Sequence, residues 1–142
     1  MLQRLLLTAL AAAFAAGVGY AGQTQSKIII PADKTSPTSG QAMYKSYCAP
    51  CHGVDGKGNG PAASALKPAP TDLTLLTKQN HGRFPGTHIV AVLEFGVDIP
   101  AHGSNLMPVW GPILGKMDKA NSQQKQLRIS NLSRYLESIQ AK

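Results

Sequence analysis

The strongest periodic pattern of apolar and polar residues lies near the C-terminal end of the chain. Apolar side chains recur there at the three- and four-residue spacing of a helix that buries one face. Asn121 or Ser122 can cap the start of this helix, which is predicted to run to about Ile139. The apolar stripe comprises Leu127, Ile129, Leu132, Tyr135, Leu136 and Ile139, whereas Lys125, Arg128, Arg134 and Glu137 are expected to face solvent.

Three shorter helices are predicted earlier in the chain. Ser39 can cap a helix from about Gly40 through Tyr47 into a pair of cysteines, and Asp72 or Thr71 can cap a short helix through about Lys78. A further helix is predicted over Ile89–Phe95, capped by Thr87 and ended by Gly96.

The remaining segments, 53–70 and 97–115, are rich in glycine and proline and are predicted to be loops, with one turn at 62–66. No strand-like alternation of any length is present, so the expected fold class is all-α with about four helices. Four short helices alone would form only a small apolar core, too small to hold loops of this length in place. Long loops in a compact domain normally have a functional reason, and a large apolar cofactor would supply the missing core.

The first 21 residues have the pattern of a secretory signal peptide. Arg4 precedes an apolar run from Leu5 to Val18, and small residues stand before a cleavage site after Ala21. The run is too short for a permanent membrane span, which takes about 20 residues. We therefore expect a signal peptide at 1–21, a largely irregular arm at 22–38 and one domain at 39–142. Removal of 1–21 would leave 13 Lys and Arg against seven Asp and Glu, a net charge of +6.

The candidate chemistry is concentrated in Cys48-Ala49-Pro50-Cys51-His52, which contains both cysteines of the chain. The spacing C-x-x-C-H is the attachment signature of c-type haem. Two thiols can add to the two vinyl groups along one edge of the porphyrin, and the adjacent imidazole then reaches the iron. A redox-active dithiol would need a βαβ context, and a disulfide over so short a loop would leave His52 without a role. A structural zinc site would need four ligands, and His81, His88 and His102 show no paired spacing.

Met107 is the leading candidate for the second axial ligand. It lies in Asn105-Leu106-Met107-Pro108-Val109-Trp110-Gly111, where Pro108 stiffens the loop. A thioether ligand favours ferrous iron and suits electron transfer. His102 and a vacant position are the alternatives. Met43 is predicted to be an adaptable core residue, and Met117 suits either role.

A ligand histidine also needs its other ring nitrogen held by an acceptor. Pro61, nine residues after His52, can fold back to present a carbonyl, and Pro68 and Pro70 are the weaker candidates.

Taken together, the sequence resembles a monohaem class I cytochrome c of the bacterial periplasmic kind. The matching pieces are Gly40-x-x-x-Tyr44, CAPCHG, GVDGKGNGPA, the Met-Pro-Val-Trp-Gly loop and a closing helix with Leu132 and Tyr135-Leu136, which together span roughly residues 39 to 140. The resemblance implies one haem c, covalently held by Cys48 and Cys51, with His52 and Met107 as iron ligands and Pro61 orienting the histidine. It also implies that Gly40 and Tyr44 lie where the first and last helices cross. Arg83, Trp110 and Lys116 are candidates for the haem rim or propionates.

The function expected from this resemblance is one-electron transfer in the periplasm, without catalysis. The alternatives are a haem subunit of a larger periplasmic oxidoreductase, and a haem enzyme or gas sensor with an open sixth position. Partners would be redox proteins with acidic docking patches, steered by scattered lysines such as Lys45, Lys57 and Lys67. A monomer is expected, with no nucleic-acid partner and no membrane span after cleavage.

Overall fold

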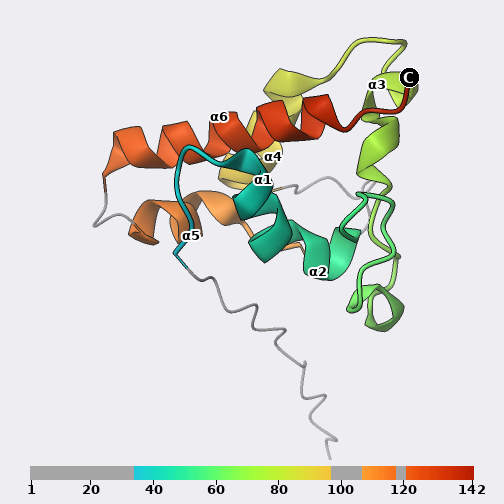
Figure 1. Ribbon diagram of the computed structural model, residues 1–142, viewed down its shortest axis with the longest axis horizontal. Helices are drawn as coiled ribbons and strands as arrows, with labels where there is room; N and C mark the ends of the chain where they lie inside the picture. The colour runs from blue at the N-terminus through green and yellow to red at the C-terminus, as the bar shows by residue number, and fades with distance from the viewer. Residues whose placement is uncertain (1–33, 97–106, 118–120) are drawn as a thin grey trace, which may run out of the picture.

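The computed structural model describes residues 34–96, 107–117 and 121–142, and this part of the chain is helical without strands. The expected signal peptide, most of the N-terminal arm and His102 lie outside the described residues. The elements in chain order (Figure 1) are α1 (Gly40–Met43), a π-helical segment (Tyr44–Cys48), α2 (Ala49–His52), 3₁₀ turns at Ala63–Ala65 and Leu73–Leu75, α3 (Leu76–Gln79), α4 (Gly86–Phe95), α5 (Trp110–Met117) and α6 (Ser122–Ser138).

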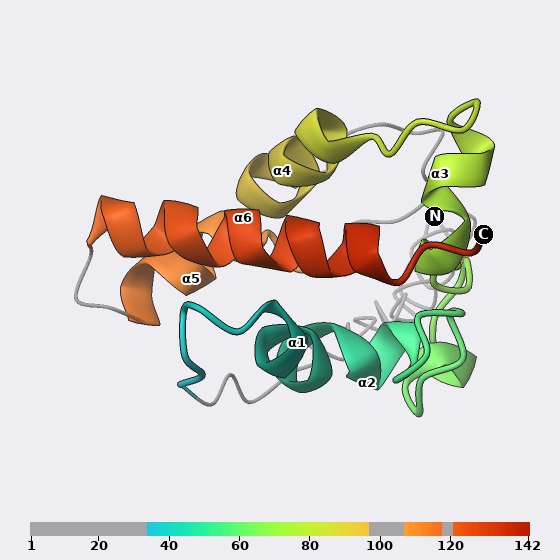
Figure 2. The ribbon, with the colours of Figure 1, turned by 45° about the horizontal axis from the view of Figure 1, so that its top comes forward.

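The first and last helices cross at close range, with α6 running between α4 on one side and α1 and α2 on the other (Figure 2). A Cβ atom at Gly40 would strike the Asn131 carbonyl and the Tyr135 side chain, so glycine permits this approach. The Tyr44 and Tyr135 rings pack with centroids 5.1 Å apart. The expected crossing of Gly40 and Tyr44 with the last helix is confirmed.

The core of the described residues lies where these helices meet. It is built from large apolar and aromatic side chains of α1, the π-helical segment, α4, α5 and α6. The principal buried members are Met43, Tyr44, Tyr47, Ile89, Leu93, Trp110, Leu114, Ile129, Leu132 and Leu136.

Several helix boundaries follow the predicted capping residues. Ser39 accepts a hydrogen bond from the Ala42 amide, Asp72 from Thr74, and Asn121 from Gln123 and Gln124. Gly96 ends α4 with a φ of 79°. The predicted start of α4 was wrong, because the helix begins at Gly86, directly after Pro85, rather than after a cap at Thr87.

The predicted loop over 97–115 was wrong in its last part, where α5 forms despite two glycines and Pro112. Proline at the third position of a helix replaces an amide that has no intrahelical partner there. Gly111 lies so close to α4 that a Cβ would strike the Glu94 carbonyl. Tertiary packing of α5 on α4 and α6 therefore outweighs the low helix propensity of these residues.

The buried face of α6 is displaced from the predicted one. Arg128 is fully buried, with Nη1 3.3 Å from Thr35 Oγ1 and 3.6 Å from Met43 Sδ, whereas Leu127 is 37% exposed. The prediction that Arg128 faces solvent was wrong, because its long side chain reaches over α1 to the described end of the N-terminal arm. No helix among the described residues is long and apolar enough to cross a membrane.

Candidate functional site

Cys48, Cys51 and His52 lie on one face of the helix that leads into the site. Their spacing of three and four residues places them on adjacent turns. The π-helical segment immediately before α2 determines which residues share this face. Its wider turn is seen in the Ala49 amide, which bonds to the Tyr44 carbonyl five residues earlier. The two cysteines do not form a disulfide; Cys48 is buried and Cys51 is partly buried. Burial raises the pKa of both thiols, that of Cys48 to about 12.

The glycine-rich loop after His52 folds back along the outside of α2. Gly53, with a φ of 81°, turns the chain, and its carbonyl accepts a hydrogen bond of 2.7 Å from the Tyr44 hydroxyl. The amides of Gly58, Gly60 and Ala62 then donate to the carbonyls of His52, Cys51 and Pro50. The loop thus satisfies the carbonyls at the end of α2, which have no partner within the helix.

This arrangement corrects the expected role of Pro61. The flanking amides hold Pro61 against the α2 backbone, where its side chain is exposed, rather than beside the imidazole ring. His52 Nδ1 instead lies 2.9 Å from the carbonyl oxygen of Thr71, to which it donates. The acceptor thus follows Pro70, one of the two prolines considered weaker candidates. The GKGNG loop brings this segment close, because a Cβ at Gly58 would strike the Pro70 carbonyl.

The Thr71 hydrogen bond leaves the other ring nitrogen of His52, Nε2, with its lone pair directed away from that carbonyl. Burial lowers the pKa of His52, and the hydrogen bond to Thr71 opposes this only in part. The ring is therefore neutral at neutral pH, which is the form that binds a metal ion.

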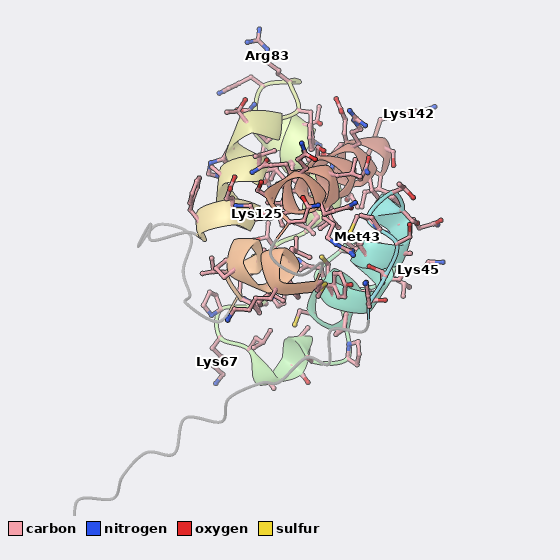
Figure 3. All side chains as sticks on the ribbon, turned by 90° about the vertical axis from the view of Figure 1, so that its left-hand side faces the viewer. Met43, Lys45, Lys67, Arg83, Lys125 and Lys142 are labelled. Atoms are coloured by element: carbon pink, nitrogen blue, oxygen red, sulfur yellow. The ribbon has the colours of Figure 1, made fainter. Side chains whose placement is uncertain are left out.

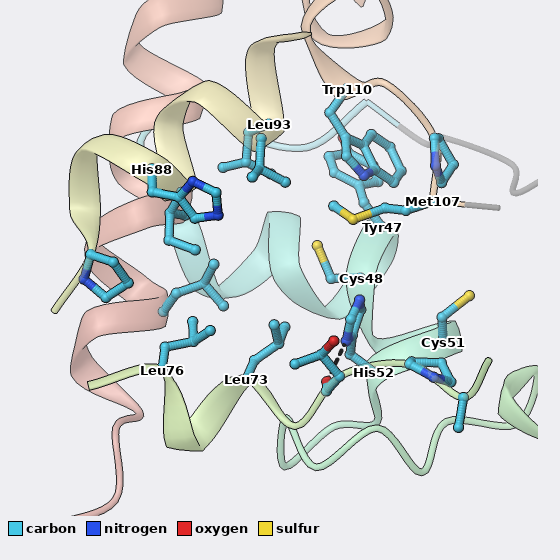
Figure 4. A pocket seen from close by; sticks show the side chains of 18 of the residues that line it. Tyr47, Cys48, Cys51, His52, Leu73, Leu76, His88, Leu93, Met107 and Trp110 are labelled. Atoms are coloured by element: carbon cyan, nitrogen blue, oxygen red, sulfur yellow. Dashed lines mark hydrogen bonds between the residues drawn. The ribbon is translucent and has the colours of Figure 1, made fainter. Parts of the chain in front are cut away.

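His52 and Met107 enter one cavity from opposite walls (Figure 4). The cavity has a volume of about 330 Å³, within the range of cofactor pockets, roughly 300 to 1,000 Å³. Cys48 and Cys51 line it beside the histidine. Most of the remaining lining is apolar and includes Leu66, Leu73, Leu76, Ile89, Val92, Leu93 and Leu136.

These residues fit a c-type haem. An apolar slot suits the macrocycle, two thiols at one edge match the two vinyl groups, and an imidazole and a thioether face each other across the slot. The structure brings together four of the five predicted site residues, Cys48, Cys51, His52 and Met107, while Pro61 is outside the lining. The groups that would provide a zinc site are not assembled among the described residues, where no three His, Cys, Asp or Glu side chains could hold one ion.

Of the three residues considered for the haem rim, only Trp110 lines the cavity. Trp110 is buried, lines the cavity and stacks on Tyr47 with ring centroids 5.5 Å apart. Arg83 and Lys116 are exposed and do not line the cavity. Met117, in contrast to Met107, accepts a hydrogen bond of 3.4 Å from the Tyr47 hydroxyl behind this wall.

Sequence reasoning missed three features of the site: the Thr71 carbonyl, the stack of Tyr47 on Trp110, and the position of His88 in the lining. A backbone acceptor leaves no side-chain signature. His88 could have been found from its helical spacing, since it directly precedes the buried Ile89 and stands four residues before Val92, which also lines the cavity.

Comparison with known proteins agrees with this geometry. The family described as cytochrome c oxidase, cbb3-type, subunit III matches residues 35–122. No curated protein and no solved structure gave a significant match. The family match covers more than half of the chain and includes the C-x-x-C-H helix, the loop behind it and Met107. The chain therefore belongs to this family of c-type cytochrome domains, and it is a monohaem cytochrome c with an all-α fold.

Proposed function

We propose that this cytochrome is a one-electron carrier of the periplasm, with its haem joined to Cys48 and Cys51 and its iron bound by His52 and Met107. The observation that carries the proposal is the common cavity into which the imidazole and the thioether project from opposite walls, with both thiols at one edge. Haem iron with both axial positions filled exchanges single electrons between its ferric and ferrous states without binding substrate.

Each of these residues has a distinct task. Cys48, at the end of the π-helical segment, and Cys51, in α2, hold one edge of the cofactor, while His52, oriented by Thr71, supplies a neutral imidazole. Met107 supplies the opposite ligand from the segment that leads into α5. The largely apolar lining limits solvent access, and solvent access is one of the factors that set a haem potential.

Surface charge supports transient docking of acidic redox partners. Lys45, Lys57 and Lys67 are exposed, and Lys45 and Lys67 extend from the body of the protein (Figure 3). Lys57 lies 4.0 Å from Asp55, with both side chains largely solvated, so this pair holds the lysine only weakly. Docking through such charges is expected to weaken as salt increases.

The ferric absorption spectrum of the holoprotein tests the proposal. Methionine–iron ligation gives a weak band at about 695 nm, which we expect in the native protein and in Met117→Ala, but not in Met107→Ala. Absence of the band from the native protein, or a high-spin spectrum at neutral pH, would exclude Met107 and favour a haem enzyme or gas sensor with an open sixth position.

A second candidate is a haem subunit of a larger periplasmic oxidoreductase, and the description of the matching family as a cbb3-type oxidase subunit favours it. Native size-exclusion chromatography, with detection of haem absorption, separates the two. A carrier elutes at the mass of a monomer, whereas a subunit elutes with a larger complex.

The expected export belongs to the same proposal. We propose cleavage after Ala21 and a domain that begins near Ser39. The intact mass of the protein recovered from a periplasmic extract tests this, because the proposed chain begins at Gly22 and carries one covalent haem.

A further inference from the structure

The cavity has a polar end at a distance from the two cysteines. Most of its lining is apolar, yet Gln79, Asn80 and His88 also contribute, the first two from the end of α3 and the third from the first turn of α4. In Figure 4, His88 and Cys51 lie at opposite ends of the cavity, with Leu73 and Leu93 between them. Figure 2 likewise places α4 and α2 on opposite sides of α6.

The positions of the substituents on haem indicate which part of the cofactor would meet this polar end. The vinyl-derived carbons that form the thioethers lie along one side of the macrocycle, and the two propionates project from the opposite side. With the thioether side held at Cys48 and Cys51, the propionates would project toward the far end of the cavity. Carboxylates are costly to bury in an apolar environment and need hydrogen-bond donors or water.

His88 offers a hydrogen-bond donor and leaves a carboxylate beside it accessible to water. Its ring lines the cavity, and the residue as a whole is exposed, so a carboxylate beside it would keep access to solvent. Asn80 also lines the cavity, and it donates a hydrogen bond of 2.7 Å to the Arg83 carbonyl in the turn between α3 and α4. Arg83 and Lys116, the cations that a sequence pattern suggests for this purpose, do not line the cavity.

We propose that His88 binds a haem propionate by a ring N–H hydrogen bond, with Gln79 on the same rim, and that this contact raises the reduction potential. The inference rests on the proposed haem attachment and ligation. The contact withdraws negative charge from a carboxylate near the iron, and local charge and hydrogen bonding are among the factors that set haem potentials. His88 is thus a positioning residue, with no part in iron ligation.

The test compares His88→Leu, which removes the donor, with His88→Gln, which retains an N–H donor of similar reach. His81→Asn is the control, because His81 is an exposed histidine outside the cavity lining whose φ of 55° asparagine tolerates. The readouts are the midpoint potential, the resonance Raman bands of propionate bending, and the ferric methionine band at about 695 nm.

We expect His88→Leu to lower the midpoint potential and shift the propionate bands, with His88→Gln close to the native protein and His81→Asn unchanged. The methionine band should persist in all three variants. Unchanged potential and propionate bands in His88→Leu would overturn the inference, as would an equal shift in His81→Asn or a change of axial ligation in His88→Leu. A native protein without covalent haem or without the methionine band would instead contradict the proposed function itself.

Discussion

His52 Nδ1 lies 2.9 Å from the carbonyl oxygen of Thr71, a residue nineteen positions further along the chain. The contact fixes the ring orientation through a backbone atom, so the side chain at position 71 is not required for it. What holds the carbonyl in place is the close approach of the GKGNG loop, in which Gly58 touches the Pro70 backbone and donates its amide to the His52 carbonyl.

Gly58→Ala is therefore expected to disturb the site, and Gly82→Ala is its matched control. Both glycines have left-handed φ angles, 78° and 80°, so both variants incur backbone strain of about 1 to 2 kcal/mol. Only at Gly58 would the new Cβ strike the Pro70 carbonyl, whereas Gly82 has no neighbour within 4 Å. We expect Gly58→Ala alone to raise the midpoint potential, because a weaker hydrogen bond makes the imidazole less basic. Equal midpoint potentials in the two variants would show that the GKGNG loop does not control the orientation of His52.

The cysteines are expected to act as two separate tethers. Cys48→Ala and Cys51→Ala should each keep the haem through one remaining thioether, while the double variant should release it on acid–acetone extraction. Because Cys48 is buried and Cys51 is only partly so, Cys48→Ala should lose more stability, by about 1 kcal/mol. Haem extraction and denaturant unfolding of the holoproteins measure these two effects. Complete release from either single variant would contradict attachment at both thiols.

The sequence was a good guide to the site where local chemistry determines structure. Cap residues such as Ser39, Asp72 and Asn121 act through amides two or three positions away, so their helix starts follow from short-range pattern. The spacing of Cys48, Cys51 and His52 acts over one helical turn in the same way. These features need no knowledge of the tertiary fold.

The features that the sequence did not reveal depend on contacts between distant segments. Helix α5 forms because Gly111 packs on the Glu94 carbonyl, although its glycines and Pro112 indicate a loop. Arg128 is buried through contacts with Thr35 and Met43, which lie 93 and 85 residues away. Thr71 rather than Pro61 lies beside His52 because the GKGNG loop packs against the backbone of Pro70 and Thr71, a contact between segments that no local pattern marks.

Substitution at the helix crossing should affect stability more than haem chemistry. Gly40→Ala would place a Cβ against the Asn131 carbonyl and Tyr135, and overpacking of this kind costs about 1 to 3 kcal/mol. Gly115→Ala, in α5, meets only the Lys125 side chain at 3.5 Å and gains helix propensity of up to about 1 kcal/mol. Denaturant unfolding of both variants should therefore give changes of opposite sign. A neutral Gly40→Ala would show that the α1–α6 crossing adapts to an added methyl group.

The Glu94–Lys125 pair, which joins α4 to α6, should make stability depend on pH in the acid range. The Lys125 ammonium lies 2.7 Å from Glu94 Oε1, and hydrogen bonds from Lys125 and Gln126 lower the pKa of Glu94. A carboxyl group with a lowered folded-state pKa stabilises the protein above its unfolded-state pKa of about 4.3, and this contribution is lost as the pH falls through the folded-state value. We expect Glu94→Gln to reduce the free energy of unfolding by about 0.5 to 1 kcal/mol at pH 7, and the difference from the native protein to shrink toward zero in acid. Denaturant unfolding of both proteins at neutral and acid pH measures this, and a Glu94→Gln difference that is constant with pH would assign its effect to packing rather than to charge.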